Sequence, residues 1–240
     1  MAAGLFARLS AAESPVPWGL LFAFNSIIVA YIMILMGTFV GAYFIGPTAL
    51  GLLVGWIIGC FLIIGFVLLA RRRDRDALYL EGSTRSLIFA ALGGLGVAIL
   101  LDVLGLSVTG DFLPVPELFE PIRQTPTPVT WIAAFWLLVV AQPIAEELVF
   151  RGIALPVLRH AFGAWVGLIV CSMAYGLFHQ LAYSSPTNDP ALVWYGLALP
   201  LLAGLFIGGV RVYTGSTRAA IAAHMAFGLF AVLKALTLAG

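Results

Sequence analysis

Charged residues are scarce in this chain: of its 240 residues, 10% are Asp, Glu, Lys or Arg, against about a quarter in an ordinary soluble domain. Hydrophobic residues make up 62%, and the mean hydropathy is +1.08. A soluble domain of this size has no interior large enough for so much apolar surface, so the composition excludes one. We therefore expect lipid to surround the chain, as one integral domain of the cell membrane.

Other features are also missing. The net charge of +1 gives no reason to expect a nucleic-acid partner. The two cysteines, Cys60 and Cys171, lie in apolar runs, show neither a disulfide framework nor zinc spacing, and are expected to be small buried hydrophobes. Residues Met1–Pro17 are too polar for the core of a signal peptide, so the apolar run that follows is expected to be a retained membrane span.

Seven apolar stretches are long enough to cross a bilayer as helices, which takes about 20 residues each. The fold class we predict is an all-α, polytopic transmembrane bundle of about seven helices. The stretches are Trp18–Phe44, Thr48–Ala70, Leu87–Leu106, Thr130–Leu155, Ala164–Tyr183, Ala191–Val210 and Thr217–Leu238.

The distribution of Lys and Arg predicts the orientation. With the N-terminus in the cytoplasm, ten of the cations fall on or near the inner side, and only Arg123 and Lys234 lie toward the outside. The reverse topology would invert that bias, so we expect a multi-pass protein with its N-terminus inside. The outer loop, residues 107–129, then contains five prolines, which favours a stiff connector over a substrate lid.

Glycines recur four residues apart at several places in the spans. Small residues at this spacing let two membrane helices approach closely, so we interpret them as packing positions and not as a nucleotide loop. They are Gly37 and Gly41; Gly51, Gly55 and Gly59; and Gly204 and Gly208.

Of the eleven acidic residues, only Glu146 and Glu147 fall well inside a span. A carboxylate at membrane depth is costly unless it is paired or hydrated, so these two indicate a functional site. Glu147 and Arg151 are four residues apart and can form a structural ion pair on one helix face. Glu146 points about 100° away and needs another partner. Pro143 should kink the helix and open room beside Glu146.

The histidines supply candidate partners. His160 lies with Arg159 in an inner loop and is expected to be solvated, whereas His179 and His224 lie within the fifth and seventh spans. Two intramembrane imidazoles and an unpaired carboxylate on a third helix favour one common site.

A carboxylate and imidazoles around a hydrated pocket are suited to hydrolysis. Glu146 would be the general base for a water that His179 holds, directly or through a metal, and His224 would donate to the oxyanion. Glu146, His179 and His224 could together bind a divalent ion such as zinc. The HExxH signature is absent, however, so a metal does not follow from spacing, and the site could equally be metal-free.

Three stretches in this region resemble motifs of the CPBP family of intramembrane proteases, which joins CAAX prenyl endopeptidases with bacteriocin-processing and immunity-type proteins. Residues 146–152 resemble its EExxxR motif, residues 175–179 its FxxxH motif, and the segment from Thr214 to His224 its third region, which ends in HxxxN. The order and the helix placement of all three agree. The resemblance implies a catalytic core over residues 130–238, with residues 1–129 as N-terminal helices and outer loop.

The resemblance implies an endopeptidase in which Glu146 and His179 activate water. It also implies that His224 contributes to an oxyanion hole or a metal site, and that the pocket opens toward the cytosol. We count Glu147 with these three as a candidate catalytic residue. The sequence departs from the family at Tyr175, where Phe is expected, and at Gly228, which replaces the Asn four residues after His224.

Gly228 has no side chain to donate, so half of the expected oxyanion contact is missing, and Gln180 or a backbone amide would have to replace it. Three hypotheses therefore stand. The first is an intramembrane endopeptidase that acts on membrane-associated peptides or proteins. The second is a non-catalytic member of the same fold that binds a membrane partner, and the third is a proton-coupled transporter.

Overall fold

The computed structural model describes residues 4–124, 126–184 and 188–239, and every regular element within these ranges is helical. Within these ranges, seven helical rods are long and apolar enough to cross a membrane, which confirms the predicted fold class. Three are single helices near the N-terminus: α2 (Leu20–Ile45), α3 (Ala49–Ala70) and α4 (Thr84–Thr109). Two more are α9 (Ala164–Ala182) and α12 (Thr217–Ala239).

The other two rods are composite. The fourth joins α6 (Pro128–Phe135), the π-helical η3 (Trp136–Ala141), α7 (Gln142–Glu147), the π-helical η4 (Leu148–Ala154) and α8 (Leu155–Phe162). The sixth joins α10 (Pro190–Val193), the π-helical η5 (Trp194–Ala198) and α11 (Leu199–Thr214). Short elements lie between rods: α1 (Leu5–Leu9), η1 (Arg75–Leu78), η2 (Pro116–Leu118) and α5 (Phe119–Arg123).

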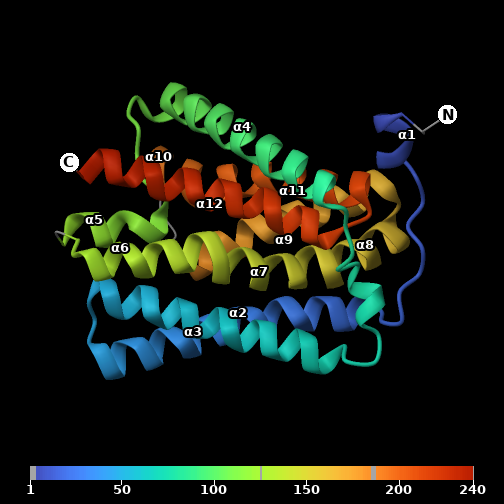
Figure 1. Ribbon diagram of the computed structural model, residues 1–240, viewed down its shortest axis with the longest axis horizontal. Helices are drawn as coiled ribbons and strands as arrows, with labels where there is room; N and C mark the ends of the chain where they lie inside the picture. Colours follow the sequence, from blue (N-terminus) through green and yellow to red (C-terminus); the bar gives the residue numbers. More distant parts are fainter. Residues whose placement is uncertain (1–3, 125, 185–187, 240) are drawn as a thin grey trace.

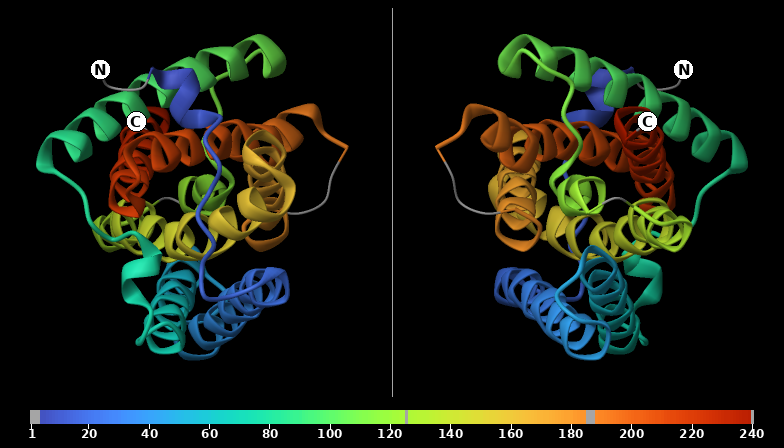
Figure 2. Two further views of the ribbon diagram at one scale, coloured as in Figure 1. Left: turned by 90° about the vertical axis from the view of Figure 1, so that its right-hand side faces the viewer. Right: turned by 90° about the vertical axis from the view of Figure 1, so that its left-hand side faces the viewer.

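The rods lie roughly side by side (Figure 1). Seen end-on, α2 and α3 form a pair on one side of the composite fourth rod, and α9, α11 and α12 lie on its other side, with α4 outermost (Figure 2). The fourth rod is the most deeply buried of the seven, because helices cover it on both sides. A polar side chain on this rod is therefore shielded from lipid.

Glycines bring α2 and α3 into close contact. A Cβ added at Gly55 would lie 2.7 Å from the carbonyl oxygen of Gly37, so only glycine permits this approach. Gly41 packs in the same way against Gly51. The packing role predicted for the spaced glycines is confirmed here, and the free, buried Cys60 and Cys171 likewise agree with the sequence.

The π-helical turns that flank α7 were not predicted. Pro143 was expected to kink the fourth span; it stands at the start of α7, directly after η3, within one continuous rod. Proline lacks an N–H and cannot complete the α-helical hydrogen-bond ladder. A π-helical turn changes which residues face a neighbouring helix, and such turns are frequent at functional sites. Here they flank the two intramembrane carboxylates.

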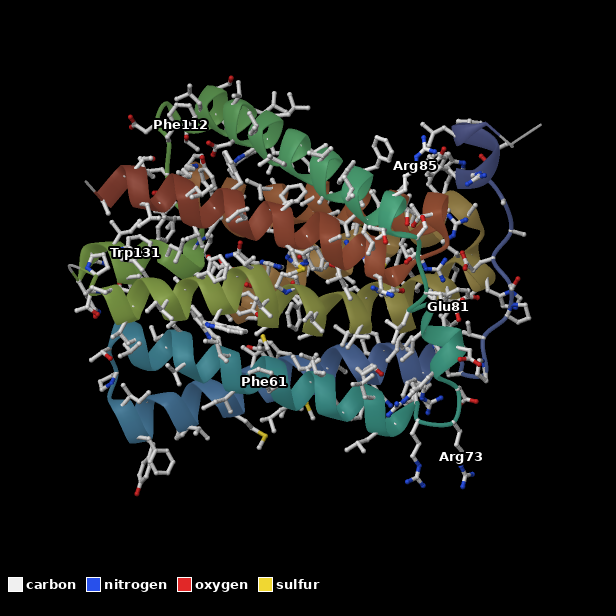
Figure 3. The ribbon with its side chains drawn as sticks, in the orientation of Figure 1. Phe61, Arg73, Glu81, Arg85, Phe112 and Trp131 are labelled. Atoms are coloured by element: carbon white, nitrogen blue, oxygen red, sulfur yellow. The ribbon has the colours of Figure 1, made fainter. Side chains whose placement is uncertain are left out.

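The N-terminal segment is tied to the end of the bundle. Glu13 accepts from Arg159 at 2.9 Å and from Arg211 at 3.1 Å, and both guanidinium groups are almost fully buried. Most of the arginines gather at this end, where Figure 3 labels Arg73 and Arg85. The predicted concentration of positive charge at one end of the spans is therefore present in the folded chain.

Candidate active site

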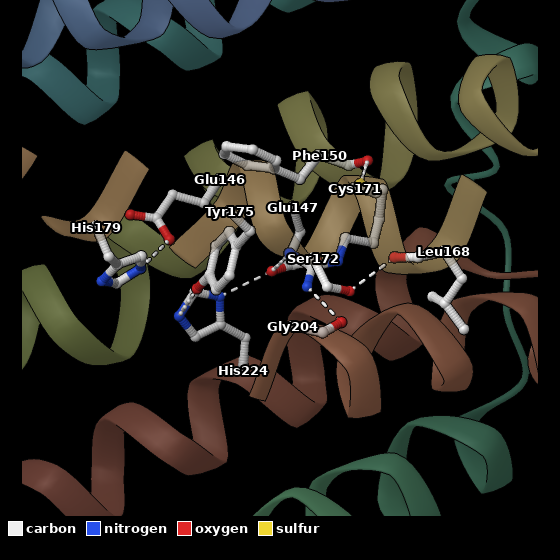
Figure 4. A network of polar contacts seen from close by, with 11 residues as sticks. Glu146, Glu147, Phe150, Leu168, Cys171, Ser172, Tyr175, His179, Gly204 and His224 are labelled. Carbon is white, nitrogen blue, oxygen red and sulfur yellow. Dashed lines mark hydrogen bonds and ion pairs between the residues drawn. The ribbon is translucent and has the colours of Figure 1, made fainter. Parts of the chain in front are cut away.

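Glu146 and Glu147 end α7, and both are buried, with 1% and 0% of their surface exposed. Adjacent residues on a helix point in directions about 100° apart. Figure 4 shows the result: the side chain of Glu146 reaches toward His179 on α9, and that of Glu147 toward His224 on α12. Each carboxylate thus has its own histidine.

Glu147 is the centre of a charged network. One of its oxygens, Oε1, accepts from Nη1 of Arg151 at 2.9 Å and lies 2.9 Å from Nδ1 of His224. Arg151 also donates to the carbonyl of Gly204 at 2.9 Å, and its guanidinium stacks over the ring of Tyr175. The structure therefore contains the ion pair expected from the spacing of Glu147 and Arg151, and it adds an imidazole to it.

Glu146 contacts His179 through one oxygen only. Its Oε2 lies 3.0 Å from Nε2 of His179, and nothing in the described part of the chain donates to its buried Oε1. An unpaired buried carboxylate oxygen is unfavourable and calls for a water or a substrate group. Oε1 of Glu146 can therefore accept from a water or a substrate group, and the same holds for Oε2 of Glu147, which also lacks a donor among the described residues.

Glu117 is a site residue that the sequence did not reveal. It belongs to η2 in the Pro-rich connection between α4 and α6, yet only 3% of its surface is exposed. Its Oε1 lies 3.6 Å from Nδ1 of His179 and accepts from the amide of Gln142 at 3.1 Å. The connection is therefore more than the stiff spacer we expected, since it carries a second carboxylate to His179.

A sequence signal existed for Gln142 but not for Glu117. Gln142 precedes Glu146 by four residues in the same span, so helical spacing alone places the two on one face. Glu117 lies in η2, a single short helical turn in a proline-rich connection, where no periodicity predicts which side chains turn inward.

Tyr175 and His224 form a second contact of the site. The hydroxyl of Tyr175 lies 3.3 Å from Nε2 of His224. Because Nδ1 of His224 faces the carboxylate of Glu147, that nitrogen carries a proton, and in a neutral imidazole Nε2 accepts from Tyr175. The partner that the additional hydroxyl of Tyr175 requires is therefore His224.

One cavity joins the two histidines. Its lining at the histidines includes Tyr175, His179, His224, Gln142 and Gly228, and it extends to the connection that holds Glu117. Apolar side chains from α4, α11 and α12 form much of the remaining wall. His179 stands between this cavity and Glu146, which it contacts. A substrate in the cavity would meet both imidazoles.

The metal set expected from the sequence does not fit this arrangement. His224 contacts Glu147 and not Glu146, and across the described residues no three His, Cys, Asp or Glu side chains are placed to hold one ion. A metal requirement remains a prediction, and elemental analysis of the purified protein tests it.

The structure shows where Gln180, one candidate substitute for the missing Asn, and Gly228 itself lie. Gln180 donates to Ser184 at 3.4 Å and is not part of the cavity lining. Gly228 lines the cavity, but a Cβ at this position would collide with the carbonyl oxygen of Leu138 in η3. An Asn side chain at residue 228 therefore has no room unless α12 moves away from the fourth rod.

The fold and these buried pairs define a class: a polytopic α-helical membrane protein with a Glu/His site enclosed among its helices. Residues 128–230 match the family model described as type II CAAX prenyl endopeptidase Rce1-like, which is consistent with the CPBP/CAAX protease family. The match confirms the resemblance seen in the three motifs. No curated protein and no solved structure matches the chain.

Proposed function

We propose that this protein is an intramembrane endopeptidase that hydrolyses peptide bonds of membrane-associated substrates with a water activated by Glu146. One observation carries the proposal: the buried carboxylate of Glu146 contacts His179, which lines the cavity, whereas the neighbouring Glu147 is paired with Arg151. The Rce1-like match over residues 128–230 supports the same class of reaction.

The reaction begins with a water beside Glu146. Glu146 takes one proton as the water oxygen bonds to the scissile carbonyl carbon, and His179 fixes the carboxylate in position. The developing oxyanion accepts a hydrogen bond from the Tyr175 and His224 pair. As the C–N bond breaks, Glu146 returns the proton to the leaving nitrogen, and the products are a new carboxylate and a new amine.

The Tyr175 and His224 pair takes the place of the Asn that Gly228 lacks. Glu147 accepts from Nδ1 of His224 and fixes the orientation of the ring. The hydroxyl of Tyr175, which contacts Nε2 of His224, gives the site one donor when it turns toward the oxyanion. Glu147 thus acts on the reaction through His224 and holds Arg151 in place.

The test replaces Glu146 by Gln, which keeps the size of the side chain and removes the base. We expect cleavage of a membrane-anchored reporter in liposomes to fall by at least about 10²-fold, the lower end of what a positioned base contributes. Glu120→Gln is the matched control, because Glu120 pairs with Arg123 on the surface. Equal cleavage by the Glu146→Gln protein and the parent would remove Glu146 from the mechanism.

A non-catalytic role in the same fold is the second candidate, and the close packing of Gly228 against Leu138 favours it, because the usual donor is excluded. Complementation separates the two. A protein that only binds a partner restores a deletion strain equally well as Glu146→Gln, whereas a protease does not.

A further inference from the structure

A second, larger cavity lies apart from the catalytic one. It is a groove between α4 and α9, with α11 along its base and α1 at one end. Its volume is about 1020 Å³, at the upper limit of small-molecule pockets, which hold about 300–1,000 Å³. None of the residues assigned to the reaction lines it, so the proposed function leaves the groove without a role.

Most of the groove is an apolar channel. On α4, Phe89 and Gly93 follow Arg85 at intervals of four residues, so all three line the groove from one side of the helix. A Cβ added at Gly209 on α11 would meet only Leu9 of α1, at 3.9 Å, so this glycine leaves room in the channel. The remaining apolar lining includes Leu168, Ile169, Leu205, Phe206 and Val210.

The end of the groove next to α1 is polar and positively charged. Arg85 and Tyr213 line it, and the hydroxyl groups of Ser83, Ser86 and Thr214 lie there as well. The guanidinium of Arg8 lies 4.9 Å from the centre of the Tyr213 ring and donates to the carbonyl oxygen of Tyr213 at 3.1 Å. In the described ranges, neither arginine has a carboxylate partner, and no acidic side chain lines the groove. This end is therefore suited to an anion that the chain itself does not supply.

An apolar channel with a cationic end matches the polarity of an anionic phospholipid. Lipid tails are as apolar as the walls, so the channel can accept an acyl chain but does not select one lipid over another. Selection has to come from the headgroup, because a guanidinium pairs well with phosphate and basic pockets between membrane helices bind anionic headgroups. A zwitterionic lipid carries its own cation beside the phosphate and gains less from the arginines.

We propose that the groove is a binding site for an anionic phospholipid, with an acyl chain between α4 and α9 and the phosphate at Arg85 and Arg8. The bound lipid would join α4 and α1 to α11. Most of the arginines gather at this end of the bundle (Figure 3), and the positive-inside rule predicts that it faces the cytoplasmic leaflet, which is rich in anionic lipids. The inference does not depend on the endopeptidase mechanism.

The experiment compares two lipids with identical dioleoyl tails, phosphatidylglycerol and phosphatidylcholine. Each is titrated into the purified protein in detergent, and the bound lipid is measured by native mass spectrometry. An arginine beside an anionic headgroup raises the affinity by about fivefold. With one or two arginines in contact, we expect phosphatidylglycerol to bind about 5–25-fold more tightly than phosphatidylcholine.

Three variants locate the site. Arg85→Gln should lower the affinity for phosphatidylglycerol by about fivefold and leave the affinity for phosphatidylcholine unchanged. Arg73→Gln is the matched control, because Arg73 is exposed at the same end of the bundle but lies outside the groove, and it should bind both lipids as the parent does. Gly209→Leu fills the channel and should weaken both lipids by the same factor. Thermal unfolding in lipid-free detergent checks that Gly209→Leu is folded, and if it is not, the two arginine variants decide.

Four outcomes would overturn the inference. Equal binding of the two lipids by the parent would leave the groove as a surface for bulk lipid. A preference for phosphatidylglycerol that survives Arg85→Gln, or an equal loss in Arg73→Gln, would assign the preference to the overall positive charge of this end. Unchanged lipid binding by a folded Gly209→Leu protein would place the lipid elsewhere on the chain.

Discussion

At the scale of single residues, the two adjacent carboxylates have different functions because a helix turns them apart. Glu147 is neutralised by Arg151 and bonded to His224, so its charge is stabilised and its geometry is fixed. Glu146 contacts an imidazole and has no arginine partner among the described residues. The two adjacent residues therefore have different roles: Glu147 carries a structural charge, and Glu146 is the proposed reactive carboxylate.

The hydroxyl of Tyr175 gives a test at this scale. Tyr175→Phe removes one oxygen and restores the residue that the family motif has at this position. Since that oxygen is proposed as an oxyanion donor, we expect kcat for the reporter peptide to fall by about 10²–10³-fold with little change in KM.

Tyr213→Phe is the control for this measurement, because Tyr213 is 43% exposed and stacks with Arg8 at the far end of the bundle. A kcat for Tyr175→Phe equal to that of the parent would assign the oxyanion contact to His224 alone.

At the scale of elements, the sequence predicted lengths and spacings well and rotations poorly. Seven spans and the separation of Glu147 from Arg151 follow from residue counts along one helix. His224 contacts Glu147 and not Glu146 because of how α12 is rotated about its axis relative to the fourth rod. The π-helical turns η3 and η4 change that relative rotation. No periodicity in a single span contains this information, and the same is true of the inward turn of Glu117.

Gly228 shows how close the contact between α12 and η3 is. A methyl group added at this position would collide with the carbonyl oxygen of Leu138. We expect Gly228→Ala to lower the free energy of unfolding by about 1–3 kcal/mol, the usual cost of overpacking a tight interface. The measurement is thermal or denaturant unfolding of the purified protein in detergent.

Gly96→Ala serves as the control, because a Cβ at Gly96 in α4 would have nothing within 4 Å. This variant should be as stable as the parent or slightly more stable, since alanine favours helix over glycine. If Gly228→Ala were equally harmless, α12 would have room to shift, and an Asn at residue 228 would no longer be excluded on steric grounds.

At the scale of the whole molecule, the charges and the cavity lie toward opposite ends. Most of the arginines gather near the N-terminal segment, whereas the cavity extends to the connection between α4 and α6 and to Lys234 near the C-terminus. If the end that is rich in arginine faces the cytoplasm, as the positive-inside rule predicts, the cavity lies toward the outer side of the membrane. The resemblance to CAAX proteases instead implies that the cavity opens toward the cytosol. The charge distribution and the resemblance therefore predict substrates on opposite sides of the membrane.

Labelling of introduced cysteines decides between them. Both native cysteines are buried, so they give little background. From the positive-inside bias we expect a membrane-impermeant maleimide to label Asp111→Cys in intact cells, and Arg73→Cys only after the membrane is permeabilised; both positions are exposed. The opposite labelling pattern would turn Lys234 and the mouth of the cavity toward the cytosol. Membrane-associated peptides made in that compartment would then be the substrates to test first.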